Sequence, residues 1–137
     1  MKTTRVGLLL AGLLSCTLAA AEAPPAGDAV RGAEVFTAQC AACHLAKEGQ
    51  SAPIGPQLYG VVGRRAGSWD GFKYTEAMKK SGFTWNRELL DKYLMNPYSL
   101  VPGAAMGLLV PIAVNRADVI AYLESKPELL KHPEPKP

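Results

Sequence analysis

Five consecutive residues set the strongest limit on this 137-residue chain: Cys40-Ala41-Ala42-Cys43-His44. Two thiols three residues apart on a helical turn can each add to one vinyl group of a porphyrin. The residue that follows then points its imidazole at the iron. This C-x-x-C-H pattern is the covalent attachment motif of c-type haem. The sequence therefore predicts one haem c, attached through Cys40 and Cys43, with His44 as an iron ligand.

A C-x-x-C pair in an exported chain has three other uses: a redox disulfide, half of a zinc site, or a structural disulfide. A thioredoxin-like site needs a strand–helix–strand pattern, which the sequence lacks. A tetrahedral zinc site needs a fourth ligand, and the other histidine, His132, lies in a proline-rich tail. Haem attachment is therefore the interpretation that these residues favour.

The N-terminus has the layout of an export signal. A basic head at residues 1–5 precedes an apolar run over residues 6–14 and small residues up to Ala21, as in a secretory signal peptide. We expect cleavage after Ala21 and a periplasmic location. The sequence also offers an alternative cleavage site. Residues 13–16 (Leu-Leu-Ser-Cys) resemble a bacterial lipoprotein box, in which Cys16 would be lipidated and would anchor the protein to a membrane.

Composition restricts the class further. Hydrophobic residues make up 48% of the chain and charged residues 20%, a balance typical of one globular domain. No apolar run reaches the roughly 18 residues of a membrane-spanning helix. The net charge of +3 falls to about +1 when Lys2 and Arg5 leave with the signal peptide, which argues against a nucleic-acid partner.

Local patterns predict an all-α fold of about four short helices joined by long loops. Capping residues, apolar spacing and prolines mark the helix ends. The predicted helices cover residues 28–42, 75–82, a segment that begins at 84–86 and ends at 96, and 115–125, with Asp28, Thr75 and Asn115 among the caps. Segments 46–71 and 98–114 are rich in glycine and proline and are expected to be loops. The predicted division of the chain is 1–21 signal peptide, 22–27 linker, 28–126 domain and 127–137 proline-rich disordered tail.

A haem iron held by one histidine has a second axial position to fill. The mature chain offers Met78, Met95, Met106 and His132. Met78 and Met95 fall in predicted helices, where methionine is usually core filler. Met106 follows the rigid-then-flexible stretch 101–105 (Val-Pro-Gly-Ala-Ala), which could bring a thioether to the opposite haem face. The residues alone favour Met106 over His132 or a vacant position.

In the order and spacing of its motifs, the chain resembles a class I cytochrome c of the soluble bacterial and mitochondrial kind. The likeness extends over roughly residues 28–125. The matching segments are CAACH at 40–44, GPQLYGVVGR at 55–64, GFKYT at 71–75, TW at 84–85, LMNP at 94–97, VPG at 101–103 with Met106, and IAYL at 120–123. The spacing of 62 residues between His44 and Met106 also agrees with the family.

The resemblance implies a cytochrome c fold wrapped around one haem, with His44 and Met106 as its axial ligands. Pro56 then corresponds to the residue whose carbonyl accepts a hydrogen bond from the other ring nitrogen of the histidine. Tyr93 corresponds to a residue hydrogen-bonded near the methionine sulfur.

Further positions match the family around the haem edge and at a helix crossing. Arg64, Tyr74 and Trp85 correspond to residues around a buried haem propionate, whose charge needs such donors. A second set corresponds to the crossing of the first and last helices: Gly32, Phe36 and Tyr122.

Four positions depart from the family pattern. Ala104 stands where a threonine commonly bonds a propionate, and Met78 stands where an asparagine often joins the hydrogen bonds near the methionine ligand. Ala105 and Leu108 replace a common lysine and phenylalanine beside the exposed haem edge. We expect a more apolar haem front than is usual, and docking that depends less on charge.

The resemblance implies one-electron transfer and no enzymatic activity, because two axial ligands leave no open position at the iron. The expected partners are redox proteins that dock weakly and transiently at the exposed haem edge of a monomer. Contact with a membrane is expected only through partners or through lipidated Cys16. Two alternatives stay open: a cytochrome subunit of a dehydrogenase or oxidase complex, and a ligand-binding or peroxidatic haem protein in which Met106 is absent or labile.

Overall fold

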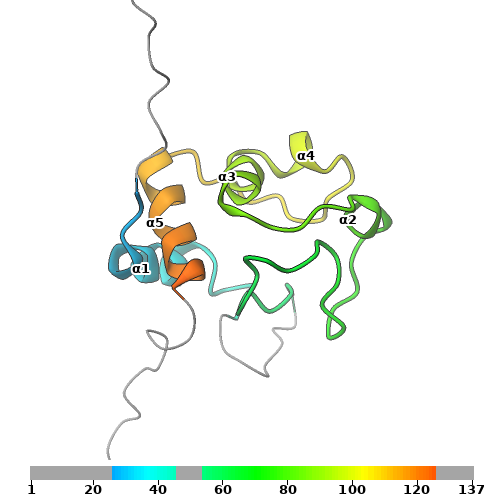
Figure 1. The fold of residues 1–137 in the computed structure, drawn as a ribbon, viewed down its shortest axis with the longest axis horizontal. Coiled ribbons are helices and arrows are strands. Elements are labelled where there is room, and N and C mark those ends of the chain that lie inside the picture. Colours follow the sequence, from blue (N-terminus) through cyan, green and yellow to red (C-terminus); the bar gives the residue numbers. More distant parts are fainter. Residues whose placement is uncertain (1–25, 46–53, 126–137) are drawn as a thin grey trace, which may run out of the picture.

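A computed structural model of the chain describes residues 26–45 and 54–125. This part of the chain forms five helices and one isolated β-bridge, between Arg65 and Thr84. The helices are α1 (Ala29–Gln39), α2 (Glu76–Lys80), α3 (Arg87–Met95), α4 (Pro97–Leu100) and α5 (Ala113–Glu124) (Figure 1). The predicted all-α class, with short helices and long loops, is confirmed. None of the helices in the described ranges has both the length and the apolar character that crossing a membrane requires.

Several predicted features lie outside the described residues. They are the signal peptide with Cys16, most of the linker at 22–27, part of the loop at 46–53, and the proline-rich tail with His132.

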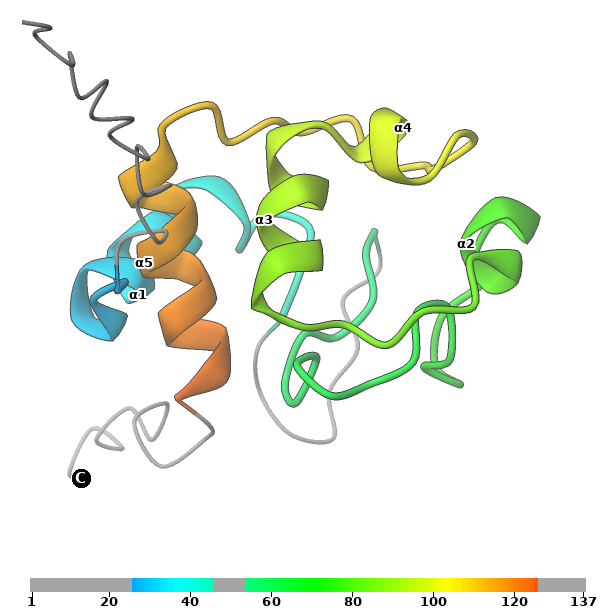
Figure 2. The same cartoon turned by 45° about the horizontal axis from the view of Figure 1, so that its top comes forward.

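The first and last helices cross at close range. A Cβ on Gly32 would lie 2.0 Å from the carbonyl oxygen of Asp118, so only glycine permits this approach of α1 to α5. The rings of Phe36 and Tyr122 pack beside the crossing, with centroids 5.3 Å apart. The expected crossing of the two terminal helices is confirmed, and α3 lies between this pair and α2 in both views (Figures 1 and 2).

Side-chain caps begin the first three helices at the predicted places. The Asp28 carboxylate accepts hydrogen bonds from the backbone of Val30 and Arg31. The Thr75 hydroxyl caps α2, and the Asn86 amide oxygen caps α3. Each cap satisfies amide groups that have no partner within the helix. The α-helix α1 ends at Gln39, three residues before its predicted end.

Two features of the helices differ from the predictions. The sequence predicts a loop after α3, but Pro97 begins α4, and the Asn96 side chain caps that helix by accepting from Ser99. Proline suits the first position of a helix, so it both ends α3 and begins α4. Asn115 is not a cap, because α5 begins at Ala113, with Ile112 as an N-cap that makes no side-chain hydrogen bond.

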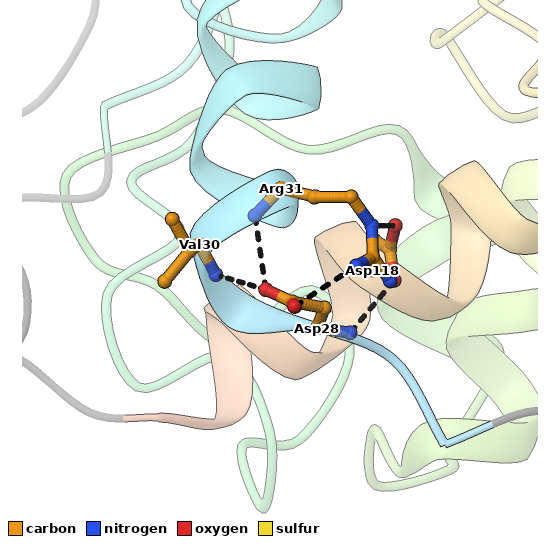
Figure 3. A network of polar contacts seen from close by, with 4 residues as sticks. All are labelled: Asp28, Val30, Arg31 and Asp118. Carbon is orange, nitrogen blue, oxygen red and sulfur yellow. Dashed lines mark hydrogen bonds and ion pairs between the residues drawn. The ribbon is translucent and has the colours of Figure 1, made fainter.

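A polar network ties the start of α1 to α5 (Figure 3). The carboxylate of Asp118 is almost fully buried and accepts from the Asp28 amide at 2.7 Å and from the Arg31 guanidinium at 2.9 and 3.1 Å. Arg31 also pairs with the Asp28 carboxylate. These contacts, with Arg31 first, hold the pKa of Asp118 below its ordinary value. The charged Asp118 carboxylate and the charged Arg31 side chain therefore hold the two helices together at their crossing.

Candidate haem-binding cavity

An apolar cavity of about 310 Å³ opens between the helices and the loops, a size typical of small-molecule sites. Its walls come from the end of α1, segments 54–64 and 72–78, helices α3 and α5, and segment 105–108. All nine residues predicted for the site line this one cavity: Cys40, Cys43, His44, Pro56, Arg64, Tyr74, Trp85, Tyr93 and Met106. The fold therefore brings together residues that lie up to 66 positions apart in the sequence.

The attachment motif reaches the cavity through the turns that follow α1. Cys40 caps the end of the helix, and its carbonyl accepts from the amides of Cys43 at 3.0 Å and His44 at 2.9 Å. Cys40 and Cys43 form no disulfide with each other; Cys40 is buried and Cys43 is half-buried. Burial raises the pKa of Cys40 to about 11, and Cys43 adds to the rise. Redox-active C-x-x-C pairs have a lowered pKa instead, so this pair does not resemble a thioredoxin site.

The ring of His44 is held by a backbone carbonyl. Its Nδ1 lies 2.8 Å from the Pro56 oxygen, so Nδ1 carries the proton and donates, and Nε2 has the free lone pair that a metal needs. Burial lowers the pKa of His44, although the bond to Pro56 acts in the opposite direction. The neutral imidazole that binds iron is therefore the favoured form.

Gly55 also shapes this position, and sequence reasoning assigned it no role. A Cβ on this buried glycine would lie 2.6 Å from His44 Cε1 and 2.9 Å from the Cys43 carbonyl oxygen. The backbone therefore passes directly against the imidazole ring. The glycine immediately before Pro56 was the one signal in the sequence, but it does not show which ring lies beside it.

A half-buried guanidinium lines another part of the cavity. Arg64 donates to the carbonyls of Tyr59 at 3.1 Å and Gln57 at 2.6 Å, and its guanidinium carbon lies 5.2 Å from the Trp69 ring centroid. Burial lowers the pKa of Arg64. Among the described residues no carboxylate lies within 4 Å of its nitrogens. A cation with donors to spare at an apolar cavity suits an anionic group such as a propionate.

Tyrosines and a tryptophan form a packed aromatic wall. The ring of Trp85 makes edge contacts with Tyr93, at 5.1 Å between centroids, and with Phe83, at 4.8 Å. Burial raises the pKa of Tyr93 to about 12, and burial also raises that of Tyr74. Both hydroxyls therefore stay protonated at neutral pH and can act as hydrogen-bond donors.

Met106 lines the cavity from a segment without regular secondary structure and is half-buried. Two of the family departures are buried: Met78, which also lines the cavity, and Ala104. The other two, Ala105 and Leu108, line the cavity and are exposed, as is Ile54. The mouth of the cavity is therefore apolar, as the sequence predicts.

The residues present suit a covalently bound haem. The cavity combines an apolar lining for the macrocycle, a neutral imidazole with a fixed tautomer, two cysteines on the same wall that form no disulfide, and a guanidinium that has no carboxylate partner in the described part of the chain. Together with the attachment motif, this arrangement defines a c-type haem protein.

Comparison with known proteins places this arrangement in a family. The family model described as cytochrome c matches residues 29–126. Cytochrome c2 of Rhodomicrobium vannielii is 43% identical over 129 residues, which cover 92% of this chain and 98% of that protein. Cytochrome c2 of Rhodopila globiformis is 46% identical over 104 residues, 75% of this chain and 96% of that protein. The structure of cytochrome cH from Methylobacterium extorquens matches with a TM-score of 0.67 and 39% identity, covering 73% of this chain and all of that one.

The chain belongs to the class I monohaem cytochrome c family. Membership means that one haem c is attached covalently through Cys40 and Cys43 and that the protein is an electron carrier, not an enzyme. The predicted family, fold and cofactor are confirmed.

Proposed function

We propose that this protein is an exported one-electron carrier whose iron is held between His44 and Met106. When bound, the haem supplies the Fe(II)/Fe(III) couple, and a methionine ligand favours Fe(II) and raises the potential. The observation that carries the proposal is the shared cavity, in which a histidine of fixed tautomer and the Met106 thioether both take part. With His44 and Met106 both holding the iron, no position would remain there for a substrate.

The surrounding residues have separate tasks. Pro56 orients the imidazole of His44 through the 2.8 Å hydrogen bond, which keeps the ring in one position in both oxidation states. Arg64, with Tyr74 and Trp85 also on the cavity wall, would neutralise a propionate of the haem. Tyr93, which lines the same cavity as Met106, would donate its hydroxyl proton toward the sulfur ligand. The apolar walls exclude water, so the surroundings reorganise little when the charge changes.

The proposal includes export to the periplasm, with a signal peptide at 1–21 and a domain at 28–126. The bacterial cytochromes c2 among the relatives support this location. The mass of the N-terminal peptide of the mature protein separates cleavage after Ala21 from lipidation at Cys16.

We propose that redox partners dock at the apolar mouth of the cavity. Residues 93–115 contain no Asp, Glu, Lys, Arg or His. This uncharged run carries exposed apolar side chains next to Met106: Leu108, Leu109 and Ile112, which are 40%, 49% and 55% exposed. The protein acts as a monomer that meets its partners briefly. The same patch suits a permanent subunit contact, and co-elution of the native protein with a larger complex in size-exclusion chromatography would favour that alternative.

The test of the axial ligand is M106A, with M95A as the matched control. Met95 is exposed at the end of α3 and does not line the cavity. We expect M106A to lose the far-red absorption band of a methionine–iron(III) bond, to fall in reduction potential, and to bind carbon monoxide promptly when reduced. M95A is expected to behave as the wild type in all three measurements.

Two results would contradict the assignment. One is an unchanged far-red band in M106A. The other is prompt carbon monoxide binding by the reduced wild type at neutral pH, which would instead favour a ligand-binding haem protein.

A further inference from the structure

We propose that Arg116 is a positioning residue for Met106: its guanidinium holds the segment after Met106 against α3 and so limits how readily the thioether leaves the iron. The inference rests on the proposed role of Met106 as a ligand. Arg116 does not line the cavity and would act only through the backbone of that segment.

Arg116 is buried at the start of α5, with 7% of its surface exposed. One terminal nitrogen donates to two successive backbone carbonyls, of Val110 at 3.0 Å and Pro111 at 2.9 Å. Its Nε donates to the Asp91 carboxylate on α3 at 2.7 Å. One side chain therefore joins α5, α3 and the segment between Met106 and α5.

A backbone bond strengthens the same anchor. The amide of Val110 donates to the carbonyl of Leu94 at 2.8 Å, and the Val110 side chain is fully buried. The segment passes the end of α3 on its way to α5 in both views (Figures 1 and 2). Leu94 itself lines the cavity, so the anchor lies beside the haem site.

A second anchor precedes Met106. The amide of Ala104 donates to the carbonyl of Val101 at 2.9 Å, and Gly103 has a φ of 94°, with Ala77 of α2 close by. In the described part of the chain, residues 105–109 make no backbone–backbone hydrogen bond. Met106 therefore lies between two points at which the backbone is fixed. The second point, at Val110 and Pro111, depends on Arg116.

A guanidinium is well suited to this position. It is planar and always charged, and it offers five donors, enough to serve one carboxylate and two carbonyls together. Hydrogen bonds from a charged donor are stronger than neutral ones, and a buried acceptor that loses its donor is costly. Without Arg116, the carbonyls of Val110 and Pro111 would turn toward water and move the segment that carries Met106.

The chain offers a matched control. Arg87, the first residue of α3, pairs with Glu124, the last residue of α5. It therefore also links these two helices, but at the end of α5 that lies away from Arg116. Its guanidinium donates to this carboxylate and not to the segment after Met106. R87Q therefore removes a bridge between α3 and α5 and leaves the Met106 anchor intact.

The experiment titrates the ferric holoprotein with imidazole, which binds only when Met106 leaves the iron. We expect R116M to bind imidazole about tenfold more tightly than the wild type, because the charged hydrogen bonds that hold the segment are lost. R87Q should stay within about twofold of the wild type, because it removes only a partly exposed ion pair. R116K should lie between R116M and the wild type, because one ammonium can keep a carbonyl contact.

Hydrogen exchange at the Val110 amide gives an independent measurement. It should be faster in R116M than in R87Q when the two variants have equal stability in urea. If R116M binds imidazole no more tightly than R87Q, the proposal is wrong. If R116M does not retain its haem, R116K takes its place in the titration. The proposal is then wrong if R116K and R87Q bind imidazole with the same affinity. A wild type without the far-red band would overturn the Met106 assignment instead.

Discussion

The orientation of His44 depends on two neighbours, one that accepts a hydrogen bond and one that has no side chain. Pro56 fixes the tautomer through its carbonyl, and Gly55 lets the backbone lie against the ring. The attachment motif identifies the ligand from the sequence because its chemistry is local. The contact with Gly55 could not be predicted, because it depends on how the loop folds back over the motif.

We predict that G55A disturbs the iron ligand as well as stability. The new Cβ would lie 2.6 Å from His44 Cε1, so the ring must move and the bond to Pro56 weakens. Overpacking of this kind costs about 1–3 kcal/mol of unfolding free energy, which urea unfolding measures. A less basic imidazole stabilises Fe(III) less, so the reduction potential should rise.

The control for this variant is G60A. Gly60 has a φ of 62°, and a Cβ added there would meet nothing within 4 Å. Alanine at this position therefore costs about 1 kcal/mol of backbone strain without touching His44. We expect G60A to lose stability at an unchanged potential. Equal potentials in G55A and the wild type would show that Gly55 does not position the ring.

At the scale of elements, the starts of α1, α2 and α3 were predictable because each cap lies next to its helix in sequence. The start of α5 was not, because Ile112 makes no side-chain cap. Instead, Arg116 binds the two carbonyls that precede this start. Such a contact is determined by packing against α3, and Asn115 misled the prediction because it is a residue type that often caps helices.

The network that joins α1 to α5 predicts a pH dependence. Arg31 and the Asp28 amide hold the pKa of Asp118 below its ordinary value of 3.8. A carboxyl whose pKa is lowered in the folded state stabilises the protein above that ordinary value, and the contribution disappears as the pH falls below 3.8. D118N should therefore be less stable than the wild type at pH 7, and the difference should narrow on acidification to pH 3 and below.

Thermal unfolding between pH 7 and pH 2.5 measures this difference, with E76Q as the control. Glu76 and Lys79 form a pair whose side chains are 71% and 48% exposed, and such pairs contribute little. E76Q should follow the wild type at every pH. A constant gap between D118N and the wild type across the range would contradict the linkage.

At the scale of the whole molecule, the charged side chains are unevenly distributed along the chain. In the described part of the chain, the ion pairs join α1 to its own N-cap and to α5, lie within α2 and α3, or link α3 to α5, whereas residues 93–115 carry no charge. The apolar character of the mouth was predictable from Ala105 and Leu108. The extent of the exposed patch was not, because the sequence does not show which apolar residues of this run face the core, as Val110 does.

We predict that electron transfer at this mouth depends weakly on ionic strength. Charge steering needs local charge, and its effect is screened over about 10 Å at 0.1 M salt. Two oxidants test this: ferricyanide, which is an anion, and a cationic cobalt(III) complex. The rate of oxidation by each should change less than about twofold between low and moderate salt. The two oxidants have opposite charges, so a charge at the mouth would make their rates change in opposite directions as salt is added. Any other effect of salt would change both rates in the same direction.

Two variants that add the same charge complete the test. L108K places a cation at the mouth of the cavity, whereas V30K places it on α1, where Val30 is 74% exposed and does not line the cavity. We expect L108K to react faster with ferricyanide at low salt, because the added cation attracts this anionic oxidant. The gain should disappear as salt is added, because salt screens the attraction. V30K should resemble the wild type. A steep fall of the wild-type ferricyanide rate with salt would mean that charged side chains outside residues 93–115 govern docking.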